Sequence, residues 1–583
     1  MQEPSNQSRQ VQNRKKVKTG CKTCKTRRVK CDESRPACRR CVSTGRVCDG
    51  YGIWGGGGTP YGQPQSNRAL STYCTPVPAG SMTSEEQSYF DWFVGQTNRK
   101  FAGLFASDFW ETLVLQASAQ EPAVRHAVVA LSAAHRFDYS NEPWSIPSTY
   151  GFDTERFTLQ QYNKAIHYLR SATGGTQKHA VRVALITCMI FVTLEYLRGQ
   201  YQMGSAHLRY GIQLLANISA PQPRSSMSPD VLNPAEDFAH NALIDAYSRL
   251  AIQAAMFGHV PSHMCVVSRD PQVHAIPYTF PSLFDARQTL DDLLNRVHCL
   301  KRHYYNIRLS LLQSETPNAE LAETQQKIIT DLSLWCKAYN SSLIRLEEEA
   351  THKSKFGTIL LRVYHEMTTI MASVCLSNDE MIFDSHTPRF LALLQGFVDL
   401  WNHWATTSIE IKELKHIFSL PESEVGCHGF TVESGFIPPV YYTALKCRIP
   451  RIRRQAIRIL RAAPHREGVW NGPLLAHILD EVVQLEEGGA YAGDASVDEP
   501  MYVAVPSVKD FPPPGIEASM RISDLAVILP EMVKGDTFIS YKKQLGGGQW
   551  ATYKQRVKPG WTKSQGSFSG FVSVLSKEGG YKD

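Results

Sequence analysis

The stretch CKTCKTRRVKCDESRPACRRCVSTGRVC, residues 21–48, decides how the N-terminal part of this chain folds. Its six cysteines form two triplets with the same spacing, C-x2-C-x6-C, and the second triplet repeats the first after 17 residues. Each half therefore offers three sulfur ligands. Structural zinc is four-coordinate and prefers thiolates. The predicted metal ligands are Cys21, Cys24, Cys31, Cys38, Cys41 and Cys48.

The ligand count predicts two Zn²⁺ ions per chain. Two tetrahedral ions need eight coordination positions, which six sulfurs fill if two of the sulfurs bridge both metals. The internal repeat indicates that the bridging sulfurs are equivalent members of the two triplets. Cys21 and Cys38 are the natural pair.

Three other uses of clustered cysteines fit the sequence less well. A disulfide framework needs an oxidising compartment, and the segment MQEPSNQSRQVQNRKK does not have the pattern of a secretory signal. A thioredoxin-like C-x-x-C pair should follow a strand, and no strand pattern precedes Cys21. A metal-storage peptide would not need the arginines of this segment. The spacing therefore favours a zinc cluster.

The six-cysteine pattern resembles the DNA-binding module of the fungal binuclear zinc cluster transcription factors. Pro36, between the two halves, matches as well. In that family the first and fourth cysteines bridge the metals, which agrees with the stoichiometric argument. The resemblance implies sequence-specific binding to double-stranded DNA at short CGG-like triplets, and action in the nucleus.

Basic residues are concentrated in the first half of the repeat. Arg27 and Arg28 lie at the positions that contact bases in the family, and arginine suits bidentate hydrogen bonding to guanine. We expect Lys22, Lys25 and Lys30 to contact phosphates, which position the module without reading sequence. The alternative for each basic residue is a solvated surface charge.

The charge distribution supports a nucleic-acid partner. Residues 1–50 contain 14 Lys and Arg against 4 Asp and Glu, a balance of +10, whereas the rest of the chain has a balance of −3. Such a local excess is the electrostatic footprint of a nucleic-acid binder. Just before the cluster, Arg14, Lys15, Lys16 and Lys18 form a basic arm that suits nuclear import, phosphate contact, or both.

The predicted fold class is mainly α, with a small two-zinc cysteine cluster that carries two short helices, a flexible linker and a large all-α domain. The linker has no heptad repeat of the kind that forms a dimerisation helix, and its glycines and prolines disfavour such a helix. The predicted parts are a basic disordered arm (1–16), the zinc cluster (17–50), the linker (51–82), the all-α regulatory domain (83–490) and a poorly defined tail (491–583).

Local signals mark helices in the large domain. Thr83 and Glu86 fit a capping box, and Pro122 fits the first turn of another helix. The segment VRVALITCMIFVTLEYL is apolar on most faces and predicts a buried helix, with YQMGSAHLRYGIQLLANI packed back on it. The uncharged run 183–194 is too short to span a bilayer, so no membrane partner is expected.

The large domain also resembles a known region. AVVALSAAHRF, YNKAIHYLRSA and the segment 447–472 look like the helical regulatory domain behind many fungal zinc clusters. The resemblance implies regulation and not catalysis. It leaves open a homodimer, a co-regulator protein or a small-molecule effector as partner, and a passive dimerisation scaffold is the alternative.

The segment 448–461 has six arginines and could be mistaken for a second DNA site. Its apolar residues fall on one helical face, so we interpret it as an amphipathic helix whose arginines are solvated or paired with acids. Enzyme motifs fail: His365-Glu366 has Thr369 where a metalloprotease has its second histidine. A helical enzyme or scaffold with a protein-binding zinc module is the competing class, but it would not need Arg27 and Arg28.

Overall fold

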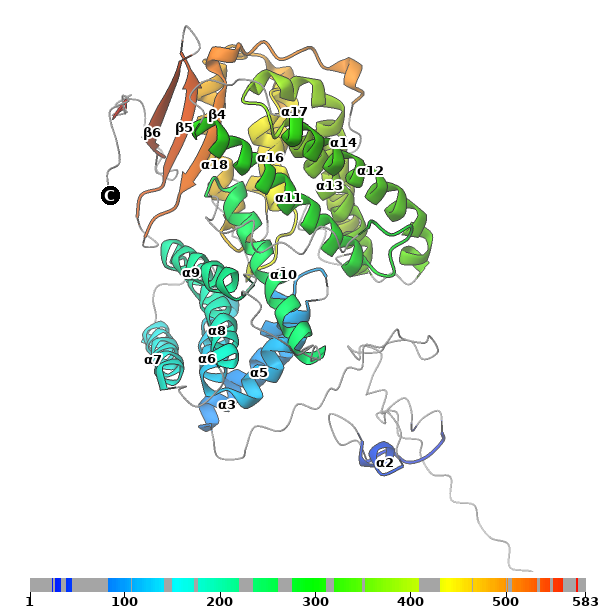
Figure 1. Cartoon of the computed structure of the whole chain (residues 1–583), viewed down its shortest axis with the longest axis vertical. Helices are drawn as coiled ribbons and strands as arrows, with labels where there is room; N and C mark the ends of the chain where they lie inside the picture. The colour runs from blue at the N-terminus through cyan, green and yellow to red at the C-terminus, as the bar shows by residue number, and fades with distance from the viewer. Residues whose placement is uncertain are drawn as a thin grey trace, which may run out of the picture. The chain divides into compact units, whose positions relative to one another are not determined.

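The computed structural model divides the chain into two compact units, Met1–Tyr73 and Cys74–Asp583. We describe each unit by itself (Figure 1). The structure describes residues 24, 27–32, 38–44, 82–105, 107–140, 149–171, 177–219, 234–259, 275–310, 319–348, 352–407, 430–463, 465–499, 501, 506–531, 535–545, 549–558 and 573–574. The predicted arm and nearly all of the predicted linker lie outside these residues, and the predicted domain boundaries stay predictions.

The second unit begins with a group of helices that pack on one another. Thr83 caps the first of them as predicted: its hydroxyl accepts from the N–H of Glu86, and the Glu86 carboxylate accepts from the N–H of Thr83. Pro122 begins α6, also as predicted. The elements are α3 (Ser84–Trp92), η1 (Phe93–Thr97), α4 (Asn98–Phe101), η2 (Phe109–Leu113), α5 (Val114–Gln120), α6 (Pro122–Ser140), α7 (Thr149–Ser171), α8 (Gln177–Leu197) and α9 (Tyr201–Ser219).

Helix α8 is the buried centre of this group. From Leu185 to Leu197 its side chains are buried except at Cys188, as the apolar pattern predicts. By length and composition α8 could cross a membrane, but 72% of its most apolar window is buried inside the unit, as expected for a core helix. Helix α9 packs back on α8, which confirms the predicted pair.

Helix α10 (Pro234–Met256) lies between the first group of helices and the second (Figure 1). It contacts α8 and α9 on one side and α11 on the other. A Cβ at Gly211 of α9 would lie 2.4 Å from the ring of Tyr247, so glycine permits this close helix contact. The second group contains α11 (Leu283–Ser310), α12 (Ala319–Glu348), α13 (His352–Val374), η4 (Glu380–His386), α14 (Thr387–Thr407), α16 (Ile437–Lys446), α17 (Pro450–Arg461) and α18 (Gly472–Glu487).

The region predicted as all-α contains a small sheet among its helices. Strand β1 (Phe430–Thr431) runs parallel to β2 (Arg466–Glu467), which pairs antiparallel with β3 (Trp470–Asn471). Between β2 and β3 the chain turns at Gly468, which has a positive φ of 58°. Strands of two residues are too short to show an alternating pattern in the sequence, so the all-α prediction missed them.

Much of the region predicted as a poorly defined tail is ordered. Three seven-residue strands, β4 (Ile522–Ile528), β5 (Phe538–Gln544) and β6 (Trp550–Arg556), form an antiparallel sheet that β7 (Ser573–Val574) extends. Short 3₁₀ turns, η5 (Ala495–Asp498), η6 (Val508–Asp510) and η7 (Ala518–Met520), precede the sheet.

The sheet is joined to the helices by hydrogen bonds from both ends of strand β4. The N–H of Val527 donates to the carbonyl of Phe257 at 3.1 Å, just after α10. The N–H of Ile522 donates to the Glu486 carboxylate of α18 at 2.7 Å. The C-terminal sheet is therefore part of the helical unit.

Candidate metal centre and nucleic-acid interface

Three cysteine sulfurs meet at the centre of the first unit. The Sγ of Cys24 lies 3.6 Å from that of Cys38 and 3.8 Å from that of Cys41, and all three side chains are buried. A disulfide bond would bring two sulfurs to about 2.05 Å. Tetrahedral zinc with Zn–S bonds of about 2.3 Å places its sulfur ligands about 3.8 Å apart. The spacing of these sulfurs fits thiolates that share a metal ion.

Cys38 belongs to two groups of potential metal ligands. Its sulfur lies within 4.8 Å of those of Cys24 and Cys41, and also within 4.8 Å of the sulfur of Cys31 and a carboxylate oxygen of Asp32. This sulfur therefore has potential ligand atoms from both halves of the repeat around it. Cys21 and Cys48, the two other predicted ligands, lie outside the described residues.

The second half of the cluster is built around helix α2 (Arg39–Val42). Cys38 is its N-cap, and the Cys38 sulfur accepts from the N–H of Cys41 at 3.3 Å. Asp32 accepts from the N–H groups of Arg39 and Arg40, each at 3.0 Å. The Asp32 carboxylate thus satisfies the start of the helix and fixes it to the first half. Asp32 was not among the predicted residues, because a residue seven positions before a helix leaves no local capping signal.

The basic segment of the first half ends in a left-handed turn. The N–H of Val29 donates to the carbonyl of Cys24 at 3.1 Å, and Arg28 between them has a positive φ of 55°. This arrangement is a helix C-terminus of the Schellman type, in which glycine usually occupies the left-handed position. Arg28 is exposed there, so the chain presents a guanidinium at a position that normally favours glycine.

The remaining predicted DNA contacts differ in their surroundings. Arg27 is half-buried, and its guanidinium donates to the hydroxyl of Thr44 at 3.2 Å, which links the two halves of the cluster. Lys30 is exposed. Lys22 and Lys25 lie outside the described residues. The structure thus brings Arg27, Arg28 and Lys30 together on one short segment.

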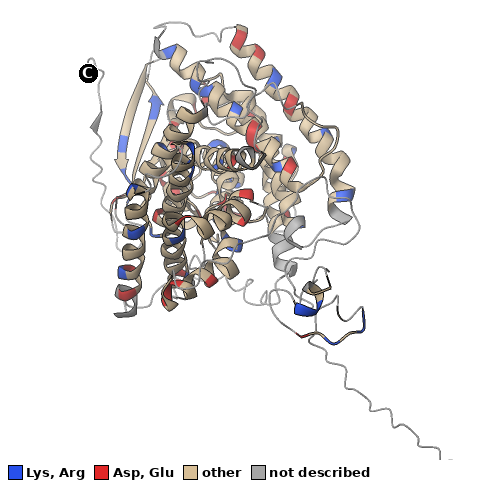
Figure 2. Cartoon of the chain, turned by 60° about the horizontal axis from the view of Figure 1, so that its bottom comes forward, with Lys and Arg blue, Asp and Glu red and all other residues tan. Residues whose placement is uncertain are grey.

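The described surface of the cluster is basic. Arg28, Arg39 and Arg40 are exposed, and within residues 24, 27–32 and 38–44 no ion pair joins them to a carboxylate. Figure 2 shows the basic residues of this segment, whereas on the helices of the second unit basic and acidic residues are interspersed. An exposed cationic surface of this kind attracts polyanions.

The arginines of the α17 segment, residues 448–461, are held by carboxylates instead. Arg448 and Arg453 are fully buried, and both pair with the buried Glu486, Arg448 at 2.9 Å. Other arginines of the segment pair with Glu487, Asp480 and Glu499. Burial by itself would raise the pKa of Glu486, but the guanidiniums of Arg453 and Arg448 lower that pKa to about 2. The prediction of an amphipathic helix with paired arginines is confirmed.

Comparison with known proteins agrees with both parts of the chain. Residues 19–53 match the fungal Zn(2)-Cys(6) binuclear cluster domain, and residues 92–378 match the fungal specific transcription factor domain. No solved structure matches the chain.

Similar proteins include three fungal regulators. The aspercryptin biosynthesis cluster-specific transcription regulator of Emericella nidulans is 24% identical over 81% of this chain and 88% of its own length. A transcription regulator of Purpureocillium lilacinum is 30% identical over 33% of this chain and 48% of its own length. The sterol uptake control protein 2 of Saccharomyces cerevisiae is 58% identical over 6% of this chain and 4% of its own length. The chain belongs to the fungal zinc cluster transcription regulators and is not an enzyme.

Proposed function

We propose that this chain acts in the nucleus as a transcription regulator. It reads CGG-like triplets of double-stranded DNA through residues 17–50. The observation that carries this proposal is the exposed Arg28, held in a fixed turn beside the cysteine sulfurs. The fixed backbone of Arg28 leaves less conformational freedom to lose when the side chain binds a base edge.

Two Zn²⁺ ions, held by the six cysteines, supply the folding energy of this part. A segment of this size buries too little apolar surface to fold without metal. Zinc binding contributes on the order of 10–16 kcal/mol per structural ion. The sulfur spacing around Cys24 and the shared position of Cys38 support this metal count, with Cys21 as the second bridging ligand.

The basic residues divide into two roles. Arg28 and Arg27 hydrogen-bond to guanine in the major groove, where bidentate contacts give about 1–3 kcal/mol of discrimination. The contact of Arg27 with Thr44 still leaves it N–H groups for a base. Lys22, Lys25 and Lys30 contact phosphates and set affinity without sequence preference.

The test uses full-length protein loaded with zinc and two labelled duplexes, one with a CGG triplet and one with the triplet scrambled. We expect tighter binding to the CGG duplex, two zinc ions per chain, and loss of both properties after treatment with a strong chelator. Equal binding to both duplexes would contradict triplet reading. Absence of DNA binding by a protein that holds two zincs would favour the competing role, a zinc module for protein contacts.

The targets and partners are proposals of the same kind. A relative that matches most of this chain is named for one biosynthetic gene cluster, which favours a comparable set of target genes here. We also propose that the helical unit supplies a dimer contact or binds a co-regulator. A genome-wide binding profile would identify target genes and half-site spacing together. Binding spread evenly over the genome, without CGG enrichment, would contradict the proposal.

A further inference from the structure

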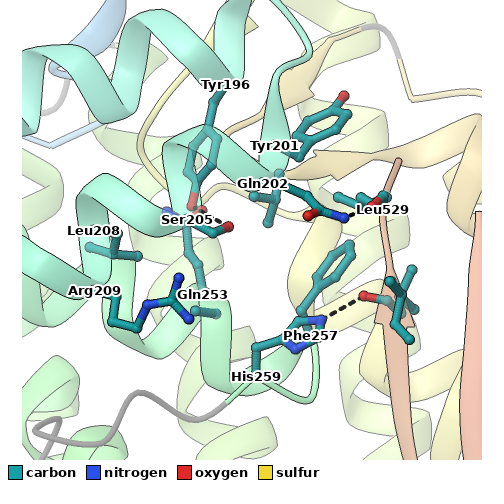
Figure 3. Close-up of a pocket in the computed structure, with 14 residues that line it drawn as sticks. Tyr196, Tyr201, Gln202, Ser205, Leu208, Arg209, Gln253, Phe257, His259 and Leu529 are labelled. Carbon is teal, nitrogen blue, oxygen red and sulfur yellow. Dashed lines mark hydrogen bonds between the residues drawn. The ribbon is translucent and has the colours of Figure 1, made fainter. Parts of the chain in front are cut away.

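A cavity of about 530 Å³ lies where the C-terminal sheet meets helices α8, α9 and α10 (Figure 3). Its volume is in the range of small-molecule sites, about 300–1,000 Å³. One wall comes from α9 and from the end of α10. The opposite wall comes from β4 and the residue that follows it, about 270 residues later in the chain than the end of α10. The proposed zinc and DNA contacts do not involve the residues of this cavity.

The walls of the cavity are mainly apolar. Leu208, Phe257, Val469 and Val527 line it, and each of these side chains is at most 7% exposed. Well-packed apolar walls hold an apolar ligand body by removing its surface from water. The body of a suitable ligand is therefore a hydrocarbon chain or ring.

One end of the cavity carries a positive charge. Among the described residues that line the cavity, Arg209 is the sole Lys, Arg, Asp or Glu, and no carboxylate within the described parts of the chain forms an ion pair with it. Figure 3 shows its side chain extending from α9 toward Gln253 of α10. A guanidinium is suited to bind a carboxylate with two parallel hydrogen bonds.

Hydrogen-bonding groups also line the cavity. The Ser205 hydroxyl, one helical turn before Arg209, lies 3.4 Å from the hydroxyl of Tyr196. The amide of Gln202 donates to the carbonyl of Leu529 at 3.2 Å, and His259 contacts the carbonyl of Val527 at 2.7 Å (Figure 3). These last two hydrogen bonds join the wall formed by α9 and the end of α10 to the wall formed by β4 and Leu529.

We propose that this cavity binds a small organic carboxylate with an apolar body, and that the ligand holds the C-terminal sheet against α9 and α10. The carboxylate pairs with Arg209, and the apolar body fills the space beside Phe257 and Val527. Because the walls belong to distant parts of the chain, a ligand that touches both favours the docked sheet over any state in which β4 separates. This inference does not depend on which DNA sequence the chain reads.

The first experiment measures ligand chemistry by calorimetric titration of the full-length protein with decanoate and with decanol. Decanoate should bind up to about fivefold more tightly than decanol, since Arg209 is exposed and an exposed ion pair contributes up to about 1 kcal/mol. Arg209→Met should remove this difference and leave decanol binding unchanged. Arg170→Met, at an exposed arginine of α7 outside the cavity, is the matched control and should change neither affinity.

The second variant tests the place of binding. Ser205 is exposed, so Ser205→Trp should fold and fill the cavity from its open side, with loss of both decanoate and decanol binding. An unchanged thermal midpoint of Ser205→Trp would show that the fold is intact. Equal affinity for the two probes, or no effect of Arg209→Met, would overturn the carboxylate class. Binding that survives Ser205→Trp, or no binding of either probe to the unmodified protein, would overturn the site.

Hydrogen exchange tests the coupling to the sheet. Decanoate at ten times its dissociation constant should slow exchange of the amides in β4 by up to about tenfold, if opening of the sheet empties the cavity. Amides in α12, which does not line the cavity, should exchange at the same rate with and without decanoate. Decanoate binding that leaves β4 exchange unchanged would overturn the proposed effect on the sheet.

Discussion

The zinc cluster and α17 both contain dense runs of arginine, yet the two sets of arginines have opposite surroundings. In the cluster Arg28, Arg39 and Arg40 are exposed, and among the described residues no ion pair joins their guanidiniums to a carboxylate. In the α17 segment Arg448 and Arg453 are fully buried against Glu486. One set faces solvent, and the other joins the α17 segment to α18 inside the core.

The two sets of arginines differ in surroundings because their neighbouring carboxylates come from different parts of the chain. Glu486 stands on α18, more than 30 residues after Arg453, so the run of arginines alone does not reveal its partner. The cluster contains few acidic residues, and Asp32 accepts from backbone N–H groups of α2. Arginine density therefore indicates a nucleic-acid site only where the fold supplies no acids to neutralise it.

The largest expected effect comes from breaking the metal centre at its shared sulfur. We propose that the Cys38 sulfur bridges two zinc ions, so Cys38→Ser should cost both ions and should abolish DNA binding. The underlying free energy is on the order of 10–16 kcal/mol per zinc. Elemental analysis and binding to a CGG duplex measure the two outcomes. Cys336→Ser, at a half-buried thiol of α12, is the control. Two zincs retained in Cys38→Ser would contradict the bridging role.

The next largest effect is expected on the free energy of unfolding, when the buried ion pairs of the α17 segment are broken. Glu486→Gln leaves Arg453 buried without its nearest carboxylate, and Arg448 keeps only Glu380 at 2.9 Å. This loss should lower the free energy of unfolding by about 3–5 kcal/mol. Urea unfolding followed by helical circular dichroism measures this change. Asp480→Asn, which removes the partner of the part-exposed Arg461, should cost less than about 1 kcal/mol. Similar losses for both variants would show that burial does not distinguish these pairs.

The stability of the folded protein should depend on pH through the protonation of the same carboxylate, Glu486. The pKa of Glu486 is lowered from 4.5 to about 2 in the folded protein, so the unfolded chain takes up its proton first as the solution is acidified. Its stabilisation is present above pH 4.5 and is lost as the pH falls toward 2. We expect the stability difference between the unmodified protein and Glu486→Gln to shrink in that range. A difference that stays constant from pH 6 to pH 2.5 would contradict this expectation.

A smaller effect distinguishes base contacts from phosphate contacts within the cluster. Arg28→Ala should weaken binding to a CGG duplex by about 1–3 kcal/mol and leave scrambled DNA nearly unaffected. Lys30→Ala should weaken binding to both duplexes alike and lower the salt slope by about one unit. Binding isotherms at several salt concentrations measure both variants. If the two substitutions act alike on both duplexes, the division of roles is wrong.

The smallest expected effect separates the backbone of Arg28 from its side chain. Arg28→Gly should lose the same discrimination as Arg28→Ala, but its cluster should be more stable by roughly 1 kcal/mol, because glycine adopts a positive φ without strain. The measurement is the resistance of the full-length protein to a chelator, followed by the release of zinc. The difference in cluster stability appears as a difference in this resistance. Equal resistance of the two variants would indicate that the left-handed turn carries no strain.

Much of the helical fold could be predicted, because its signals are local. The capping box of Thr83 and Glu86 and the apolar faces of α8 depend on neighbours within a few turns. The C-terminal sheet was missed, although Ile539 and Tyr541 alternate with less buried residues along β5. A seven-residue strand has few repeats of its pattern, and its pairing partners are distant in sequence.

The amino acids alone are enough to recognise the six-cysteine repeat, the basic character of the cluster and the positions of Arg27 and Arg28, because ligand spacing and charge are properties of a short segment. The folded chain is needed to recognise the burial of Arg448 and Arg453, the link of Asp32 to α2 and the cavity beside Arg209. Each of these features needs atoms from segments far apart in the chain, and such contacts form only when the chain has folded.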